Sequence, residues 1–427
     1  MCSAETESGV SRRVVVTGMG ALSPLGSTWE GVSERIRNRH SAIRILPELG
    51  LLDGLSTRLA APIDDFETPK HYPRKKTRSM GRVSLLATRA TERALLDASL
   101  IEHPVLASGR TGISYGSTSG SPPAMALYAS AMQKNSTIKG IRATDYIQLM
   151  SHSTAANLAQ FFEVTGRVIT TCSACTSGSQ GIGYGYEAVA SGHQDVMITG
   201  GAEEFHAIEA AVFDIMFATS TRNDAPETTP RPFDVDRDGL VIGEGAATLV
   251  LESLEHAEAR GAKIHAEVVG YGTNCDGKHI TNPDQAGMAR VMELSLASAG
   301  LEAGSIAYVN AHGTATEAGD IAESLAMESV FGHDLPTSSL KSFMGHTLGA
   351  SGSLEAWMTI EMQRDGWFAP TLNLESVDPR CGRLDYLRGE GRPIDAPLVM
   401  SNNFAFGGIN TSLIFRRWDE AAPQKPS

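Results

Sequence analysis

Residues Val168–Ala190 read VITTCSACTSGSQGIGYGYEAVA, a short β-branched run followed without a linker by a glycine-rich stretch. The run from Val168 to Thr171 predicts a buried strand, and Ser177 to Ala190 predicts a helix. Each glycine inside a helix costs about 1 kcal/mol relative to alanine. So many small residues therefore indicate a buried helix that packs closely against other backbone. Cys175 lies where the strand ends and the helix begins.

Strand-like and helix-like segments alternate in the same way along the rest of the chain, which predicts an α/β fold with largely buried sheets. The strands are expected at 13–17, 111–115, 196–199, 248–251, 265–269, 306–310 and 398–401, and the helices at 84–98, 286–299, 318–330 and 353–363. No linker separates independent domains. A weak seam at Arg260-Gly261-Ala262 predicts two halves, 13–262 and 263–418, with flexible tails at 1–12 and 419–427.

Composition excludes several classes of partner. The 427 residues carry a net charge of −13, which disfavours nucleic acid. No run of about 18 apolar residues occurs, so a membrane span is not expected. Five irregularly spaced cysteines, with no secretory leader before them, indicate reduced thiols in the cytoplasm.

One basic segment runs against the acidic balance of the chain. Its cations between residues 70 and 82 include Arg74, Lys75, Lys76 and Arg78, and no acidic residue interrupts them. Such a run is either a solvated helix face or a docking patch for an acidic protein. Composition alone does not choose between the two.

Cys175 is the first candidate for chemistry. A thiol at a helix N-terminus gains from the helix dipole and from free amides, so we expect its pKa to be lowered. Cys172-Ser-Ala-Cys175 also has the spacing of a redox pair, which leaves a dithiol protein as an alternative. A buried, inert cysteine describes Cys172 better than Cys175.

Two histidines occupy settings that suit an activating role. His312 follows a predicted strand in VNAHGTAT, and His346 lies in the glycine-rich KSFMGHTLGASG with Lys341 five residues before it. Strand ends and helix starts are where α/β proteins place their sites. The spacing of these residues is not that of a metal site. The dinucleotide turn at Gly18 and the phosphate loop at Gly272 are both incomplete, so neither a metal nor a cofactor is expected.

Five blocks then occur in a fixed order: SACTSGSQGIG, RPFDVDRDGLVIGEGA, NAHGTATEAGD, KSFMGHTLGASG and SNNFAFGGIN. Together they resemble the β-ketoacyl-acyl-carrier-protein synthases, and most closely the elongating synthase II type of the thiolase superfamily. The resemblance runs from about residue 13 to residue 418. It implies a five-layered αβαβα thiolase-like fold of two similar halves, assembled as a dimer. It further implies an acyltransferase whose substrates ride on the phosphopantetheine arm of acyl carrier protein, with no bound cofactor.

The resemblance also assigns roles to residues. It makes Cys175 the nucleophile, His312 and His346 its catalytic histidines, and Lys341 the family's lysine with Glu323 as acidic partner. The remaining implied positions are Phe406 and Phe404 at the acyl gate, the amides of Cys175 and Phe406 as oxyanion hole, Thr281, Thr314 and Thr316 along the pantetheine tunnel, Asp320 as a supporting carboxyl, and Arg74, Lys75, Lys76 and Arg78 as the carrier-docking patch.

The implied reaction is a decarboxylative Claisen condensation of a malonyl thioester with the Cys175-bound acyl chain. It extends the chain by two carbons in fatty-acid or polyene and polyketide biosynthesis. Ala405, Ile409 and Ser119 depart from the commoner family pattern and bear on the pocket. The combination of HYPRKK, SACTSGSQGIGY and SNNFAFGGIN is similar to aryl-polyene ketosynthases. The ketosynthase subunit of a heterodimeric aryl-polyene or polyketide system is therefore the alternative to a homodimer. A thiolase would carry a second cysteine in place of SNNFAFGG.

Overall fold

The computed structural model describes residues 11–419 except residues 135 and 280. Most of the two predicted tails, residues 1–10 and 420–427, therefore lies outside the described residues. Arg12, at the inner end of the first tail, is held by the carbonyl of Ala190 at 3.0 Å and by the carboxylate of Asp195 at 3.0 Å.

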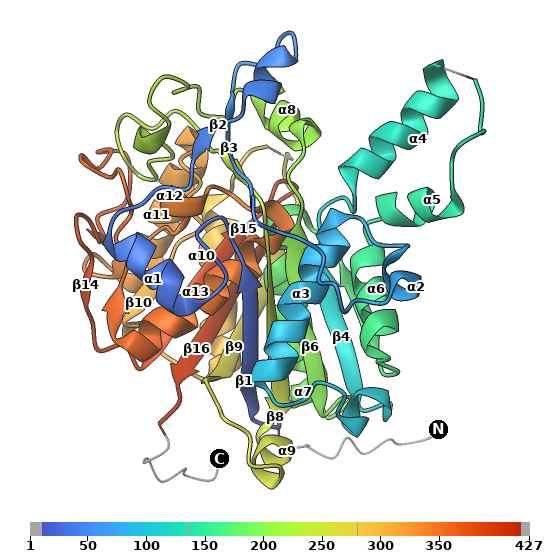
Figure 1. Cartoon of the computed structure of the whole chain (residues 1–427). Coiled ribbons are helices and arrows are strands. Elements are labelled where there is room, and N and C mark those ends of the chain that lie inside the picture. The colour runs from blue at the N-terminus through green and yellow to red at the C-terminus, as the bar shows by residue number, and fades with distance from the viewer. Residues whose placement is uncertain (1–10, 135, 280, 420–427) are drawn as a thin grey trace, which may run out of the picture.

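One large sheet runs through the molecule, and its two halves repeat one topology (Figure 1). Across the sheet the strands are β13 (Asp385–Tyr386), β11 (Pro336–Ser338), β10 (Tyr308–Asn310), β15 (Leu398–Phe404), β16 (Ile409–Arg417), β9 (Ala266–Cys275), β1 (Val14–Leu22), β8 (Gly245–Ser253), β6 (Val196–Glu203), β4 (Thr111–Gly116) and β5 (Val168–Thr171).

Outward from the centre, the strands of the N-terminal half follow the order β1, β8, β6, β4, β5. The strands of the C-terminal half follow the matching order β9, β16, β15, β10, β11, with β13 added at its outer edge. The pairings also agree, because β4 and β10 are parallel to both of their neighbours and the inner pairs are antiparallel. The halves join where Val14–Val16 of β1 pair with β9. Two small sheets complete the set: β2 (Arg44–Ile45), β3 (Leu59–Ala61) and β7 (Ile242–Gly243) form one, and β12 (Trp367–Phe368) and β14 (Arg392–Pro393) form the other.

Helices form three layers around the two halves of the sheet. The central layer is α7 (Ser177–Ala190) and α13 (Ser351–Asp365), which pack against each other and against strands of both halves. The outer layers are α3 (Arg82–Asp97) and α6 (Ser153–Phe162) on one half, and α10 (Gln285–Ala299) with α11 (Glu317–Phe331) on the other. This αβαβα arrangement is the thiolase-like fold that the sequence predicts.

Shorter helices lie outside these layers, and α4 and α5 project from the body as an arm (Figure 1). They are α1 (Trp29–Arg37), α2 (Arg74–Thr77), α4 (Pro122–Lys134), α5 (Ala143–Leu149), α8 (Ala207–Ile215), α9 (Leu254–Ala259) and α12 (Lys341–Met344). No helix among the described residues has the length and apolar character that crossing a membrane requires.

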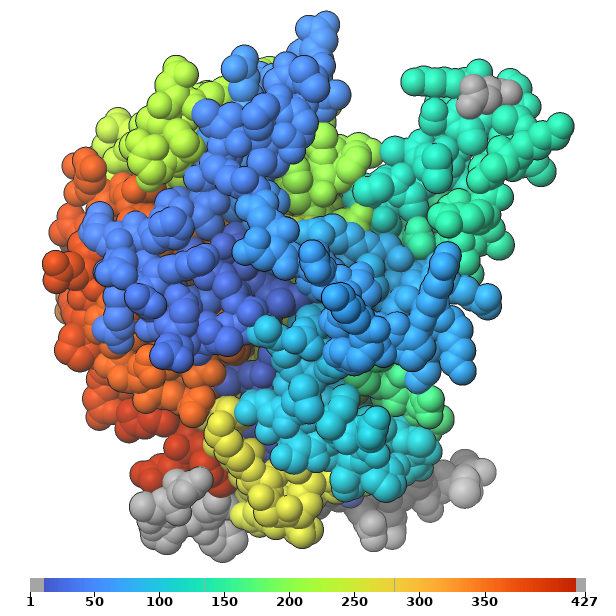
Figure 2. Space-filling view, viewed as in Figure 1, coloured from blue at the N-terminus to red at the C-terminus, as the bar shows by residue number. Residues whose placement is uncertain are grey.

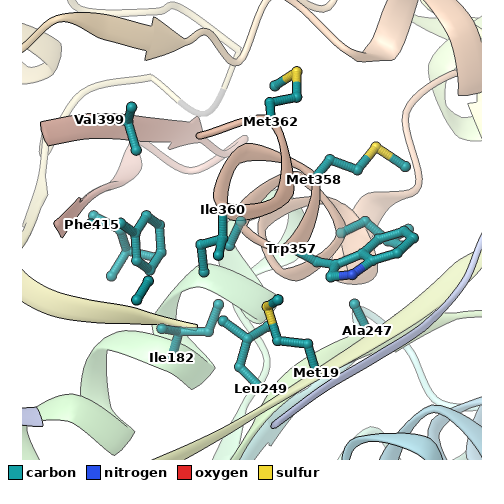
Figure 3. Packing of buried hydrophobic residues seen from close by; sticks show 14 of the residues in the cluster. Met19, Ile182, Ala247, Leu249, Trp357, Met358, Ile360, Met362, Val399 and Phe415 are labelled. Carbon is teal, nitrogen blue, oxygen red and sulfur yellow. The ribbon is translucent and has the colours of Figure 1, made fainter. Parts of the chain in front are cut away.

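The two halves share one apolar core. Figure 3 shows Leu249 of β8, Ile182 of α7, Trp357 and Ile360 of α13 and Phe415 of β16 converging in a single cluster. All five side chains are at most 3% exposed. Burial of such a side chain contributes about 1.5–3 kcal/mol, so the cluster fixes the halves relative to one another.

Two predicted elements are confirmed without change, and a third is confirmed as a strand but ends later than predicted. Val168–Thr171 is β5 and Ser177–Ala190 is α7. The first strand does not end in a turn at Gly18 but continues as β1 through Gly18 and Gly20 to Leu22. A Cβ on either glycine would lie within 2.3 Å of a carbonyl oxygen of α3. Here glycine allows a helix to approach a strand closely and does not form a turn.

Candidate active site

Cys175 lies in a tight turn between β5 and the N-terminus of α7. Ala174 adopts a positive φ of 50°, a left-handed conformation that costs a non-glycine residue about 1–3 kcal/mol. The hydroxyl of Ser177 stabilises the turn by accepting the amide of Ser173 at 3.0 Å and donating to the carbonyl of Ala174 at 2.7 Å. Cys175 is 4% exposed at the start of the helix.

The expectation of a lowered pKa at Cys175 is wrong. Burial raises the pKa of this thiol to about 12. The Lys341 charge and the backbone amides of Phe406 and Cys175 oppose the rise without cancelling it. The helix N-terminus is present as predicted, but desolvation of the thiolate outweighs the groups that stabilise it.

His312 follows β10 and is held by two different groups. Its amide and that of Gly313 donate to the carboxyl of Glu323, each at 2.7 Å. The ammonium of Lys341 lies 3.2 Å from Nδ1 of the ring. An ammonium can only donate, so Nδ1 accepts and the ring proton is on Nε2.

His346 has the same tautomer for a different reason. Its Nδ1 accepts the amide of Leu348 at 3.3 Å, where the chain turns into α13 with a φ of 46° at Leu348. Nε2 of His346 is buried and bonds to no described residue. Both histidines therefore present an Nε2 proton.

The structure brings these three residues together. The sulfur of Cys175 and one ring nitrogen from each histidine lie within 4.8 Å of one another. The two imidazole rings meet edge to face, with centroids 5.2 Å apart. Burial, reinforced by the charge of Lys341, lowers the pKa of both histidines well below the ordinary 6.5. Both rings are therefore neutral hydrogen-bond donors at pH 7.

The acidic partner of Lys341 is Glu355 and not Glu323. Lys341 and Glu355 form a buried ion pair in which Nζ donates to Oε1. The second carboxylate oxygen of Glu355 accepts Nδ2 of Asn403 at 2.7 Å. Sequence reasoning missed both residues. The available indication was a charged residue within the apolar helix after His346, since such a residue is rarely buried unless paired.

The other supporting carboxyls shape the backbone. Glu323 holds the turn at His312, and its burial raises its pKa to about 8. Asp320 accepts the amides of Phe233 at 2.7 Å and Ala315 at 3.1 Å, and burial raises its pKa to about 6. Neither carboxyl makes an ion pair with Lys341, so both act on the loop that carries His312.

A cavity of about 380 Å³ connects Cys175, His312 and His346 to the surface. Thr281, Thr314 and Thr316 line it, as do Phe404 and Phe406. The hydroxyls of Thr314 and Thr316 lie 2.9 Å apart.

Phe406 closes one side of this cavity. Its ring stacks on Phe213 of α8 with centroids 5.3 Å apart. The ring of Phe404 meets His312 edge to face at 6.0 Å. Phe213 also lines the cavity but escaped sequence analysis, because only the packing of α8 against the loop after β15 reveals its place.

The predicted docking patch forms α2 and its C-cap, on the N-terminal half. Arg74, Lys75 and Arg78 are exposed and make no ion pair with a described residue. Lys76 differs, because its ammonium donates to the carbonyl of Phe161 at 2.8 Å and to Glu163 at 2.9 Å. Three of the four predicted cations are thus free to meet a partner.

These side chains could also bind a metal ion or form a redox-active dithiol. A thiolate with two imidazoles is a donor set for Zn²⁺. Here both Nε2 atoms carry protons and the Lys341 cation adjoins the site, so the arrangement favours hydrogen-bond donation. The interpretation of Cys172 as the buried cysteine is wrong, because Cys172 is exposed and Cys175 is buried; both are free thiols. A redox pair would also leave both histidines without a role.

A buried cysteine at a helix N-terminus, facing two neutral histidines on a thiolase-like fold, defines a condensing enzyme. Residues 11–257 match the Beta-ketoacyl synthase, N-terminal domain, and residues 265–375 match the Beta-ketoacyl synthase, C-terminal domain. The chain belongs to the beta-ketoacyl synthase family, and it is an acyl-transferring enzyme.

Individual relatives cover almost the whole chain. The 3-oxoacyl-(acyl-carrier-protein) synthase 1 of Haemophilus influenzae is 37% identical over 410 residues, which cover 96% of this chain and 100% of that protein. The crystal structure of a beta-ketoacyl synthase from Burkholderia phymatum is 55% identical, with a TM-score of 0.94 over 96% of this chain and 100% of that one. The ishigamide ketosynthase/chain length factor is 33% identical, with a TM-score of 0.88 over 96% and 100%.

Proposed function

We propose that this chain is the catalytic subunit of a 3-oxoacyl-acyl-carrier-protein synthase and that Cys175 carries the growing acyl chain. The observation behind the proposal is the pair of histidines whose Nδ1 atoms are occupied. The pair therefore offers two Nε2 protons beside the sulfur, which is the donor geometry that an enolate oxygen requires.

In the first half-reaction Cys175 attacks the carbonyl carbon of an acyl thioester on the carrier's pantetheine arm. The amides of Cys175 and Phe406 reach the thiol and serve as the oxyanion hole. The new carbon–sulfur bond forms as the bond to the arm breaks. The proton of the Cys175 thiol ends on the departing thiol.

In the second half-reaction a malonyl thioester occupies the same arm site. Loss of carbon dioxide leaves an enolate, whose oxygen accepts the Nε2 protons of His312 and His346. Each donor of this kind typically contributes about 3 kcal/mol to the transition state. The enolate carbon attacks the acyl-Cys175 carbonyl, Cys175 leaves as thiolate, and one proton from water restores the thiol. No metal or organic cofactor takes part.

For the assembly we propose a homodimer. β5 is the last strand of the large sheet, and Val168 on it is 43% exposed. An edge strand of this kind is a template for pairing with another chain. The α4–α5 arm adds further exposed apolar residues, namely Met125, Leu127, Met132, Tyr146 and Ile147. This chain holds all three catalytic groups and needs no catalytic residue from a different subunit, so the proposed partner is a second copy of the chain. A heterodimer with a chain length factor is the alternative.

The acyl group proposed is a fatty or polyene chain, and the compartment proposed is the cytoplasm, which the free cysteines support. The test is a panel of acyl-carrier thioesters, read as the intact mass of the protein and as mapped peptides. We expect one adduct on Cys175, and the preferred donor separates saturated from conjugated chains. An adduct elsewhere, or none on folded protein whose Cys175 still reacts with iodoacetamide, would contradict the proposal. Light scattering with and without a co-expressed chain length factor separates the two assemblies.

A further inference from the structure

The C-terminal end of α8 exposes large apolar side chains to solvent. Phe217 is 95% exposed and Ile215 is 77% exposed. Val212 and Ile208, about one and two turns before Ile215 on the same helix face, are 50% and 41% exposed. In Figure 2 this region lies at the surface, across a hollow from the α4–α5 arm.

The backbone at this end of α8 is fixed in an unfavourable conformation. Phe217 has a φ of 54°, in the left-handed region that suits glycine or asparagine and disfavours a bulky side chain. The amides of Phe217 and Ala218 close the helix on the carbonyls of Asp214 and Phe213, both at 2.9 Å. Flexibility therefore does not explain why Phe217 points into solvent.

Residues on neighbouring elements hold this turn in place. The carboxylate of Asp214 accepts the amides of Ser56 at 2.9 Å and Thr57 at 3.1 Å, and the hydroxyl of Thr219 at 2.8 Å. The turn after α8 is thus anchored to the loop before β3 and to its own downstream residues. The exposed aromatic ring is presented on a rigid support.

The same residues border the entrance to the catalytic cavity. Met216 and Phe217 line the cavity that contains Cys175, together with Phe213. We infer that Ile215, Met216 and Phe217, which we call the α8 lip, bind an apolar patch on the carrier protein while its pantetheine arm enters the cavity. This inference rests on the proposed function and names the chemistry of its partner.

The α8 lip adjoins the entrance of the catalytic cavity, and this position favours the carrier protein as its partner. A second copy seated on the α8 lip would cover the cavity mouth that the arm must pass. The carrier body stays outside while its arm delivers the thioester, so it is the molecule that remains at the rim during the reaction. Exposed cations on α2 attract an acidic carrier, and the α8 lip adds a short-range contact that salt does not screen.

The test compares two donors of one acyl group: the carrier-bound thioester and the N-acetylcysteamine thioester, which enters the cavity without a carrier. Phe217→Asn removes the ring and tolerates the left-handed backbone. We expect KM for the carrier-bound donor to rise about tenfold, several times more than KM for the small thioester. The rise should persist at about 0.5 M NaCl.

Two matched variants and a mass measurement complete the design. Phe217→Tyr keeps the aromatic ring and should retain most of the affinity for the carrier. Leu96→Ser removes a 53% exposed leucine near the end of α3, outside the cavity lining, and should change neither KM.

Three outcomes would overturn the inference. An equal rise for both donors would mean that Phe217 acts on the cavity alone. A change in native mass of Phe217→Asn would assign the α8 lip to contacts between copies. A wild-type enzyme that accepts the small thioester and never the carrier-bound donor would overturn the proposed function as well.

Discussion

The two halves of the molecule share one topology but bring different groups to the site. In the N-terminal half the third strand, β5, leads into α7, and Cys175 lies at that junction. In the C-terminal half the third strand, β11, leads toward α13, and His346 lies before the start of that helix. His312 follows β10, the counterpart of β4. The repeated topology thus places two equivalent helix N-termini face to face. The N-terminal half contributes Cys175 there, and the C-terminal half contributes His346.

Small residues let the two helices meet so closely. α7 opens with Ser177-Gly178-Ser179, and α13 opens with Ser351-Gly352-Ser353. A Cβ on Gly178 would lie 2.9 Å from the amide nitrogen of Ser353, and one on Gly352 would lie 2.7 Å from that of Ser179. The two helices differ one turn later, where α13 carries Glu355. This carboxylate pairs with Lys341 and positions its ammonium beside His312.

The largest expected effect separates the chemistry of the halves. Cys175→Ala should abolish acyl transfer, with chain extension falling by more than about 10³-fold, yet it should still decarboxylate the malonyl thioester. His346→Ala should reduce decarboxylation by about 10²–10³-fold while acylation of Cys175 falls much less. Intact mass reports acylation, and carbon dioxide release reports decarboxylation. Equal loss of both steps in His346→Ala would contradict the assignment of decarboxylation, and not acylation, to this histidine.

The second effect concerns pH, because burial acts in opposite directions on the two kinds of group. The pKa of Cys175 is raised to about 12, so its thiolate fraction should grow about tenfold per pH unit from pH 7 to pH 9. The pKa of His312 and of His346 is far below 6.5, so both rings stay neutral over the same range. Iodoacetamide labelling of Cys175 should rise about 100-fold between pH 7 and pH 9, while malonyl decarboxylation stays flat. A labelling rate that levels off near pH 8 would show a stabilised thiolate.

The third effect tests the contact between α7 and α13. Gly178→Ala places a methyl group against the backbone of Gly349 and Ser353, and it should lower the free energy of unfolding by about 1–3 kcal/mol. Gly352→Ala should behave alike. Gly31→Ala is the control, because a Cβ there meets only the Thr28 hydroxyl, at 3.4 Å. Chemical denaturation measures all three, and destabilisation by Gly31→Ala equal to that of the others would contradict the close contact.

The sequence predicts the elements around Cys175 and the three catalytic residues better than it predicts the buried contacts around them. The strand and helix around Cys175 follow from local pattern, and the order of five motifs finds Cys175, His312 and His346. Neither shows that Glu355 pairs with Lys341, because only the turn between β11 and α13 brings them together. The direction of the pKa shift at Cys175 was predicted wrongly for a related reason. A helix N-terminus can be recognised in the sequence, whereas the depth of burial of the thiol is a property of the packed structure. The repeated Ser-Gly-Ser was the available sign of two matching halves.

The smallest expected effect concerns charge, which the two halves also distribute unequally. Lys75 and Arg78 of the N-terminal half are exposed and unpaired with any described residue, whereas the cavity threonines belong to the C-terminal half. Lys75→Glu with Arg78→Glu should raise KM for the carrier-bound donor about five- to tenfold at low salt, since charged rims mainly set encounter rates. The increase should vanish near 0.5 M NaCl, because exposed charges are then screened over roughly 4–5 Å.

Arg290 on α10 supplies the control for that charge change. It is exposed on the C-terminal half, with 61% of its side chain accessible, and among the described residues its one ion pair is to the neighbouring Glu293. Arg290→Glu, added to a second exposed reversal on the same half, changes the net charge equally but should leave KM for the carrier unchanged. An equal increase from both halves would mean that only net charge matters and that α2 is an ordinary solvated face. An increase confined to Lys75 and Arg78 would show that the carrier approaches over the N-terminal half, while its arm reaches the threonines of the other.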